Sequence, residues 1–379
     1  MTDRYIENDT APCLSEPDPR SQLLKSLTKL VTNYAPRKPW IDTFKEKPQG
    51  LWTGPTSVAY LFFWLSKIYP DLSVEGRLPA EWCERYLDCG SEELTSPKDL
   101  NGWGIKNEYL AYNVVKAVAT EDMLYVEKVT NALTTDFDCP KLFNEHLSGR
   151  AGTLALLRIL RHWMPGTSAL VSGCMKPLID HIMGEIPWTF SGHRYIGAAH
   201  GDIGILTQLV LCDNSMGMDP RFESQLIDLL DVQQEDGHWP ITPDPNLGSP
   251  DLVHYCHGSP GFVHSLMKIK PFVRPELQER VSASIDLGRR EVWQKGLLRK
   301  EPNLCHGITG NMLAFEDWGQ REHFMAYATA ESIESGIRDG TFLAGDDPYG
   351  LLWGEAGRAW GWLMIDAELE LGYPSYTDV

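Results

Sequence analysis

Short apolar stretches alternate along the chain with more amphipathic ones, and a glycine-containing turn precedes each apolar stretch. Residues 57–69, SVAYLFFWLSKIY, follow the turn that ends at Gly54, and residues 153–163, TLALLRILRHW, follow the turn that ends at Gly152. Apolar-rich runs of this length without regular alternation predict buried helices. The last glycines of the turns are Gly54, Gly104, Gly152, Gly204, Gly261, Gly310 and Gly357.

These turns recur at steps of about fifty residues, and a period of this size is typical of toroids, solenoids and propellers. Each period also holds a second, more amphipathic helical segment, such as residues 21–34 and 221–234. Two-helix units that close on themselves predict an all-α fold, an α/α barrel or toroid of seven two-helix repeats. We expect the apolar helices to form the inner ring and the amphipathic helices the outer ring. The glycine turns would gather at one end, because glycine lets backbones approach closely.

The domain organisation follows from the same pattern. Residues 1–20 are rich in Pro, Asp and Ser, and we expect them to form a flexible tail. Residues 37–49 form a Pro- and charge-rich connector, but no low-complexity linker follows residue 50. We therefore predict a single barrel domain over residues 21–379.

Composition narrows the classes of function. The chain is 42% hydrophobic with 13 Trp, 14 Tyr and 12 Phe, which suffices for a large core. A net charge of −18 argues against a nucleic-acid partner, because phosphate binding needs clustered Lys and Arg. No apolar run approaches the roughly 18 to 20 residues of a membrane span. Scattered cysteines and a polar amino terminus without a signal peptide favour a reducing, cytoplasmic compartment, where we expect a monomer.

Two turns carry a thiol beside an imidazole, as Cys256-His257-Gly258 and as Cys305-His306-Gly307. Cys and His suit a zinc ion, and three protein ligands would leave a fourth position open, as in catalytic sites. If the turns share one rim, Cys256, Cys305 and His306 become neighbours and could bind Zn²⁺. His257 is an alternative ligand, and the residues do not choose between the two imidazoles. The simpler interpretation is that these cysteines and histidines fill the core.

His200 lies on the preceding turn, Ala199-His200-Gly201-Asp202, and could face the same cavity. With an ordinary pKa near ~6.5, an imidazole can donate or accept a proton at neutral pH. His200 is therefore a candidate catalytic acid or base. A histidine that caps a helix or bonds within the rim is the structural alternative.

Together these motifs resemble the lanthionine synthetase C-like family, in particular its eukaryotic members. The resemblance rests on Gly149-Arg150-Ala151-Gly152, on Ala199-His200-Gly201 and on the two Cys-His-Gly words, and it covers the chain from about residue 20 onward. It implies an α/α toroid with zinc bound at one end. Cys256, Cys305 and His306 match the zinc ligands of the family, and His200 matches its proposed acid/base histidine.

The resemblance also assigns candidates with weaker support. Glu145 falls where the bacterial cyclases carry an essential Asp, although acidic residues also favour helix amino termini. Lys300 resembles a basic residue that eukaryotic relatives use near glutathione, and Arg358 and His257 are further candidates for substrate binding at the same rim. Leu252 stands where the cyclases have an Arg, which argues against lanthipeptide cyclisation.

We therefore expect an enzyme that adds a thiol to a dehydroamino acid or a similar Michael acceptor. Glutathione or a peptide cysteine would be the nucleophile, and elimination of phosphate from phosphoserine or phosphothreonine could come first. A non-catalytic protein that binds zinc and glutathione is the alternative. A terpene- or prenyl-processing barrel is a further alternative by analogy of fold alone, but no convincing Asp-rich diphosphate motif is present, since Asp346-Asp347-Pro348 is more simply a turn.

Overall fold

The computed structural model describes most of the chain, and its contacts divide the chain into two compact units. The described residues are 4–8, 17–37, 48–90, 102–135, 142–244, 251–345 and 348–379. Unit 1 comprises the described parts of Met1–Pro17, Asn144–His146 and His181–Gly345, and unit 2 those of Asp18–Phe143, Leu147–Asp180 and Asp346–Val379. Asp346 and Asp347 and most of the connector at 37–49 lie outside the described residues. The single domain over residues 21–379 stays a prediction.

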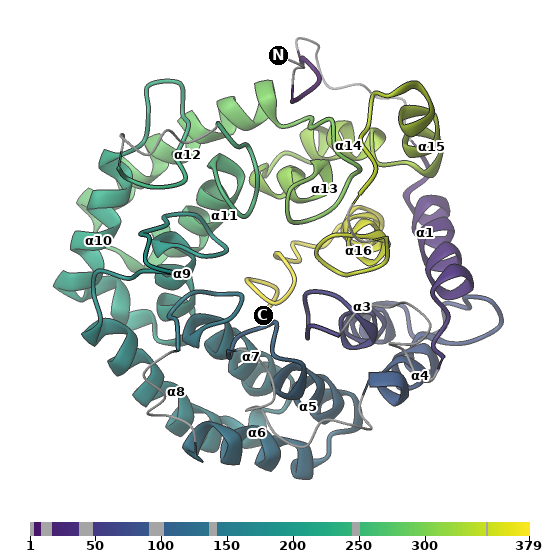
Figure 1. Cartoon of the computed structure of the whole chain (residues 1–379), viewed down its shortest axis with the longest axis horizontal. Coiled ribbons are helices and arrows are strands. Elements are labelled where there is room, and N and C mark those ends of the chain that lie inside the picture. The colour runs from purple at the N-terminus through teal and green to yellow at the C-terminus, as the bar shows by residue number, and fades with distance from the viewer. Residues whose placement is uncertain are drawn as a thin grey trace. The chain divides into compact units, whose positions relative to one another are not determined.

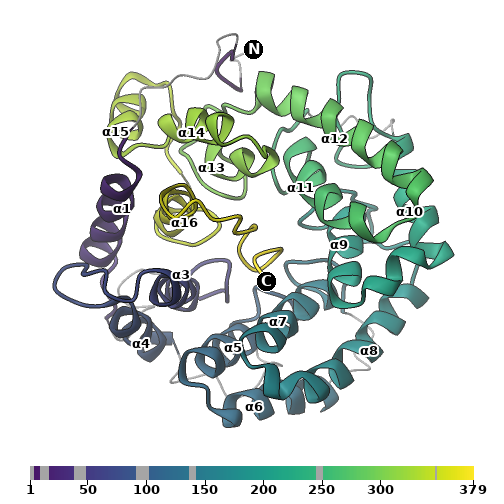
Figure 2. The same ribbon diagram turned by 180° about the vertical axis from the view of Figure 1, so that it is seen from behind.

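Unit 2 is built from paired helices. They are α1 (Pro19–Asn33), α3 (Pro55–Ile68), α4 (Pro79–Gly90), α5 (Glu108–Thr120), α6 (Met123–Thr135), α7 (Arg150–Trp163), the short η2 (Pro165–Thr167), most of α8 (Ser168–Gly184), and α16 (Glu355–Asp366). Helix α3 packs on α4, and α5 packs on α6 and α7 (Figure 1). Helices α1 and α16 lie side by side in both views (Figures 1 and 2). The first and last helices of the unit are therefore neighbours, although the sequence separates them widely.

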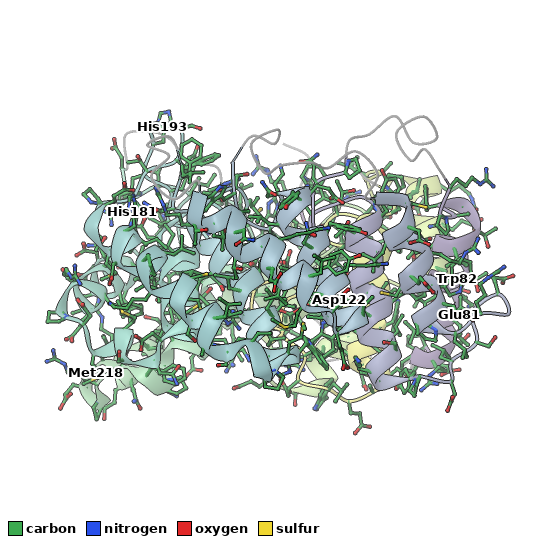
Figure 3. All side chains as sticks on the ribbon, turned by 90° about the horizontal axis from the view of Figure 1, so that it is seen from below. Glu81, Trp82, Asp122, His181, His193 and Met218 are labelled. Carbon is green, nitrogen blue, oxygen red and sulfur yellow. The ribbon has the colours of Figure 1, made fainter. Side chains whose placement is uncertain are left out.

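Unit 1 repeats the pairing. Its helices are α9 (Asp202–Cys212), η3 (Asn214–Met218), α10 (Pro220–Asp231), α11 (Ser259–Ile269), η5 (Lys270–Phe272), α12 (Pro275–Lys295), α13 (Ile308–Asn311), η6 (Met312–Ala314), α14 (Trp318–Ala326) and α15 (Ala330–Asp339). Helices α9 and α11 pack on each other, while α10 packs on α9 and α12 on α11. In Figure 3, His193 and Met218 stand at opposite edges of this unit. Because these residues flank α9, its amino-terminal turn lies toward the edge that carries His193.

The two predicted kinds of helix differ in burial. Along α7 every residue from Arg150 to Leu160 is buried, whereas α10 buries one face that includes Phe222, Leu226 and Leu229. Full burial of a Leu or Phe side chain contributes about 1.5 to 3 kcal/mol, so the apolar helices supply much of the core. None of the described helices is long and apolar enough to cross a membrane.

One predicted helix is shorter than its sequence pattern suggests. Of the apolar segment after Gly310, residues 311–318 (NMLAFEDW), only Asn311 belongs to α13. The 3-10 turn η6 follows, with Phe315 as its carboxyl-terminal cap. The side chain of Asp317 then accepts a hydrogen bond from the Gln320 amide and caps the start of α14. A strong cap two residues after the apolar run starts a new helix there instead of extending the old one.

Backbone hydrogen bonds join successive glycine turns within each unit. In unit 1, His146 N donates to Ala199 O at 3.2 Å, Ala199 N to Cys256 O at 3.4 Å, and Cys256 N to Cys305 O at 3.2 Å. In unit 2, the corresponding bonds run from Leu51 N to Ile105 O, from Lys106 N to Leu147 O and from Leu352 N to Trp52 O. Each unit thus gathers its turns side by side, as the glycine pattern predicts.

Part of the expected tail is held against unit 1. Ile6 N donates to Leu297 O at 2.7 Å, and Arg299 N donates to Arg4 O at 2.9 Å. Asn8 is buried; its side-chain amide donates to Trp293 O at 2.9 Å. Residues 4–8 therefore differ from the flexible tail predicted over 1–20, because they satisfy polar backbone groups of the α12–α13 connection.

Candidate metal centre

The turn that carries Cys256 doubles back on itself before α11. His254 N donates to His257 O at 3.1 Å, which closes a tight loop around Cys256. Gly258 has φ of 114°, and a Cβ at this position would overlap the carbonyl oxygen of Leu252. Only glycine combines this backbone conformation with such a close approach. The sequence Cys-His-Gly therefore fixes where the thiol of Cys256 lies.

The turn that carries Cys305 and His306 is held by Asn303. The Asn303 Oδ1 atom accepts a hydrogen bond from His306 N at 2.9 Å, and Asn303 O accepts one from Gly310 N at 3.0 Å. A Cβ on Gly310 would overlap Leu304 O, so the second glycine of the Gly-x-x-Gly turn is required by close contact. The first turn of α13 is thereby packed against Leu304, the residue before Cys305.

Asn311 ties the two thiol-bearing turns together. Its buried Nδ2 atom donates to Val253 O at 3.0 Å and to Gly296 O at 2.8 Å. Val253 lies three residues before Cys256, so α13 fixes both turns at once. With the backbone bond from Cys256 N to Cys305 O, this arrangement sets the separation of the two thiols before any ligand arrives.

The sulfur atoms of Cys256 and Cys305 and a ring nitrogen of His306 all lie within 4.8 Å of one another. In tetrahedral zinc sites the bonds of about 2.3 Å to sulfur and 2.0–2.1 Å to nitrogen place neighbouring ligand atoms about 3.5 to 3.8 Å apart. Small side-chain adjustments would bring the three atoms to that spacing, so the donor set and its geometry fit zinc. Within the ranges that the structure describes, no other group of this kind is found.

The electrostatics of the cluster favour a thiolate. A hydrogen bond from Cys305 holds the pKa of Cys256 well below its usual range, against the opposing effect of burial, and His254 and His306 act in the same direction. Cys305 is only 2% exposed, whereas Cys256 is half-buried. The thiolate is the form of cysteine that binds metals.

His257, the alternative ligand, lies outside this group. Its ring centroid is 6.0 Å from that of His200 and 5.8 Å from that of Tyr195. Burial lowers its pKa, with the Cys256 thiolate acting in the opposite direction. The structure thus brings His306 to the thiols and leaves His257 between them and His200.

Glu145 and His200 form a hydrogen-bonded pair. Glu145 Oε2 lies 3.0 Å from His200 Nδ1, and the Glu145 side chain is 1% exposed. The Phe190 ring stacks on His200 with centroids 4.4 Å apart and an interplanar angle of 16°. Two contacts therefore fix the imidazole, and its partly exposed Nε2 is the atom left for proton transfer. Glu145 and His200 are separated by 55 positions in the sequence. The backbone hydrogen bond from His146 N to Ala199 O joins their two turns and brings the side chains together.

Three aromatic residues of the site are missed by sequence reasoning. His254 Nδ1 lies 4.0 Å from Cys256 Sγ. Phe190 and Tyr195 flank His200, and Tyr195 also contacts His257. His254 could have been noticed, because a His two residues from a Cys is a common spacing in metal sites. Phe190 and Tyr195 carry no such signal, since the turn between them (Phe190 pairs with His193) brings them to the site.

The two basic candidates lie in different surroundings. Lys300 is half-exposed in an extended segment that pairs with Leu343, and its ammonium forms no ion pair with any residue of the described ranges. Arg358 is 1% exposed, and its guanidinium pairs with Glu355 at 2.7 Å within unit 2. Substrate binding by Lys300, Arg358 and His257 stays a prediction.

Comparisons with known proteins support the family resemblance seen in the sequence. The family model of lanthionine synthetase C-like proteins matches residues 45–376. A Danio rerio protein named glutathione S-transferase LANCL1 is 34% identical over 155 residues, which cover 38% of this chain and 36% of that protein. The Arabidopsis thaliana LanC-like protein GCL1 is 27% identical over 260 residues, which cover 61% and 57%. The chain thus matches 36% and 57% of the lengths of these two relatives.

The solved structure of nisin cyclase shares the fold. It superposes with a TM-score of 0.63 at 12% sequence identity, and the match covers 93% of this chain and 96% of the cyclase. At this identity the likeness concerns the fold alone. It confirms the predicted all-α class, the α/α toroid of two-helix repeats.

Proposed function

The chain belongs to the lanthionine synthetase C-like family, and on that basis we propose that it is a zinc-dependent enzyme that adds a thiol to a dehydroamino acid or a similar Michael acceptor. The observation that carries the proposal is one constellation within unit 1. Two thiols and an imidazole lie within 4.8 Å of one another. The ring centroid of His257, the residue after Cys256, lies 6.0 Å from that of His200, which is hydrogen-bonded to Glu145. A thiol-activating centre thus stands beside a proton-transfer group.

Cys256, Cys305 and His306 would hold the metal, with the fourth position left for substrate. Zinc bound there would lower the pKa of an incoming thiol and so present it as a thiolate at neutral pH. Cys256 is half-buried, and substrate would approach the cluster from its side. Glutathione or a peptide cysteine is the proposed nucleophile, consistent with the name of the LANCL1 relative.

His200 would carry the proton. In the addition, the thiolate sulfur forms a bond to the β-carbon of the acceptor, and the electron pair of the C=C bond moves to the α-carbon. The α-carbon then takes a proton from His200 Nε2, and solvent returns a proton to the imidazole. Glu145 accepts a hydrogen bond from His200 Nδ1, which fixes the tautomer that exposes Nε2 and stabilises the protonated ring.

A non-catalytic protein that binds zinc and glutathione is a second candidate. It is favoured by Leu252, which stands where the resemblance to the bacterial cyclases places an Arg. Leu252 is half-buried, and its carbonyl oxygen packs against Gly258. The position therefore supplies backbone packing to the Cys256 turn without a cationic side chain, and the proton-transfer chemistry would depend on His200 alone.

Two measurements separate the candidates. Purified protein is analysed for zinc after dialysis and is then incubated with glutathione and a dehydroalanine peptide, with thioether formation followed by mass spectrometry. We expect about one zinc per chain and a rate well above the uncatalysed reaction. Bound zinc without rate acceleration would favour the binding protein, and absence of zinc would refute both. His162→Leu, which changes an exposed histidine on α7 in unit 2, serves as the control.

A further inference from the structure

The two cysteines of the candidate metal centre differ in their access to solvent. Cys305 is 2% exposed, while Cys256 is half-buried. A site that handles Michael acceptors faces a selectivity problem, because a cysteine thiolate of the protein is itself a nucleophile. Burial shields Cys305 from an electrophile. Cys256 lacks that protection, so its survival as a ligand requires another restraint.

His254 stands beside Cys256 in a position to supply this restraint. Its Nδ1 atom lies 4.0 Å from the Cys256 sulfur, and its ring centroid lies 5.7 Å from that of His306. It does not belong to the group of three donor atoms that lie within 4.8 Å of one another, so it borders the metal site from outside. The backbone bond from His254 N to His257 O and the anchoring of Val253 O by Asn311 fix this position.

We propose that His254 donates its Nδ1–H to the Cys256 thiolate and so keeps Cys256 from reacting with the acceptor substrate. A hydrogen bond to a charged sulfur withdraws electron density from the lone pairs that would attack. If Cys256 did react, its sulfur would bond to the β-carbon, the C=C electron pair would move to the α-carbon, and water would protonate that carbon. The sulfur would then lose its negative charge, and with it most of its strength as an acceptor, so the lost hydrogen bond adds to the barrier.

This hydrogen bond would explain why the proposed addition uses an incoming thiol and spares Cys256. The explanation rests on the proposed function. An incoming thiolate beyond the reach of His254 would stay the stronger nucleophile, so the acceptor would react with it in preference to Cys256. Partners outside the ligand shell commonly tune a metal site in this way. His254 is thus a positioning residue that acts through Cys256.

The experiment compares the reactivity of the two cysteines in zinc-loaded protein. Iodoacetamide, whose iodide a cysteine sulfur displaces, and a dehydroalanine peptide without added thiol are the two probes. Modification of Cys256 is followed by peptide mass spectrometry with Cys305 as an internal reference. We expect His254→Leu to speed modification of Cys256 by about five- to tenfold, the effect of losing one hydrogen bond. His254→Asn, whose side-chain N–H stands near the place of Nδ1–H, should return the rate toward that of the wild type. His162→Leu, at an exposed position on α7 in unit 2, should leave it unchanged.

Equal rates at Cys256 in the wild type and in His254→Leu, with zinc content unchanged, would overturn the inference. A His254→Asn variant as reactive as His254→Leu would do the same, because shape and not hydrogen bonding would then be responsible. If His254→Leu loses zinc, His254→Phe keeps the ring and removes the donor. The outcome is independent of the proposed function: faster modification of Cys256 without thiol addition to dehydroalanine by the wild type would uphold the hydrogen bond and refute the enzyme.

Discussion

The glycine turns of the two units share one backbone design and differ in the side chains that they present. In both units backbone bonds join one turn to the next, and a glycine caps the apolar helices, except that Asn107 caps α5 in unit 2. The residues two positions before the cap glycines are Ala199, Cys256 and Cys305 in unit 1, and Trp52, Leu147 and Leu352 in unit 2. The residues one position before them are His200, His257 and His306 in unit 1, and Thr53, Ser148 and Trp353 in unit 2.

The difference shows that the turn is a scaffold and that two positions on it decide the chemistry. In unit 2 these positions serve packing: Trp52 and Trp353 meet edge to face with centroids 4.8 Å apart, and Leu352 is buried. In unit 1 the same positions supply thiols and imidazoles. Substitutions at these positions should therefore affect function in unit 1 and stability in unit 2.

The largest effect is expected from the thiols. Cys305→Ala removes one of three protein ligands, and we expect zinc affinity to fall at least about a thousandfold, since structural zinc sites owe about 10 to 16 kcal/mol to a few ligands. Chelator competition and metal analysis measure the loss. Cys83→Ala is the matched control from unit 2, because Cys83 is also buried and burial raises its pKa to about 12, so it stays a neutral thiol. If Cys305→Ala retained zinc, Cys305 would be a core residue like Cys83 and would not bind the metal.

The next effect is expected at the proton-transfer pair. His200→Asn should lower kcat for thiol addition by about a hundredfold or more, because it removes the group that protonates the α-carbon. Glu145→Gln should lower kcat by about tenfold and leave zinc content unchanged, since Glu145 acts through His200. Steady-state kinetics separate kcat from KM. An unchanged kcat in His200→Asn would assign this pair to the structure of the turn, as in unit 2.

The sequence predicts the contacts of the backbone better than those of the side chains. The repeat of glycine turns predicts the two-helix architecture, because each glycine reports a close backbone approach, as at Gly258 and Gly310. The words Cys-His-Gly predict the ligands, because equivalent positions on successive turns become neighbours. The helix after Gly310 was predicted too long, since the apolar run conceals the new start that Asp317 imposes.

Contacts that depend on side-chain direction could not be predicted. Nothing in the sequence says that Phe190 stacks on His200, because a turn of the chain brings the ring back over the site. The sequence also does not tell which of His257 and His306 lies with the two thiols, because each histidine follows a cysteine in a Cys-His-Gly motif. Arg358 was expected to line the rim. Its i,i+3 spacing from Glu355 on one helix indicates an ion pair, but the sequence gives no sign that both side chains are buried in the core.

A third prediction concerns this ion pair of unit 2. Arg358→Ala leaves the Glu355 carboxylate buried with Lys29 as its remaining cation, and we expect a loss of about 3 to 5 kcal/mol in the free energy of unfolding. Burial alone would raise the pKa of Glu355, but Arg358 and Lys29 lower it to about 2. The stabilisation is therefore present above the ordinary value of 4.5 and is lost as pH falls toward 2.

Denaturant unfolding of Arg358→Ala at pH 7 and pH 3 measures both parts of this prediction. The difference from the wild type should shrink at the lower pH, while zinc content at pH 7 stays unchanged. The double variant Glu355→Gln with Arg358→Met serves as a control, because removing both charges should restore part of the stability. A stable Arg358→Ala variant with impaired thiol addition would instead support substrate binding by Arg358.

The smallest effect is expected at Glu108, a second buried carboxyl of unit 2 with the opposite pH dependence. It accepts hydrogen bonds from Gly50 N at 2.6 Å and from the Thr56 hydroxyl. Among the residues that the structure describes no cation lowers its pKa, and burial raises that pKa to about 7. The folded state therefore binds a proton more tightly than the unfolded state, whose value is near 4.5. Ionising Glu108 costs nothing below pH 4.5, and the full cost is present above about pH 7.

Glu108→Gln removes that cost while keeping the shape of the side chain and an acceptor for Gly50 N. We expect the variant to match the wild type at pH 4.5 and to exceed its free energy of unfolding at pH 8 by up to about 3 kcal/mol. Denaturant unfolding across this range measures the slope, with Glu81→Gln on the exposed side of α4 as a control. A difference that does not grow between pH 4.5 and 8 would mean that Glu108 is already ionised at low pH, so that the two hydrogen bonds outweigh burial. The turns of unit 2 would then tolerate charge as readily as those of unit 1, and the division between packing turns and chemical turns would rest on the thiols alone.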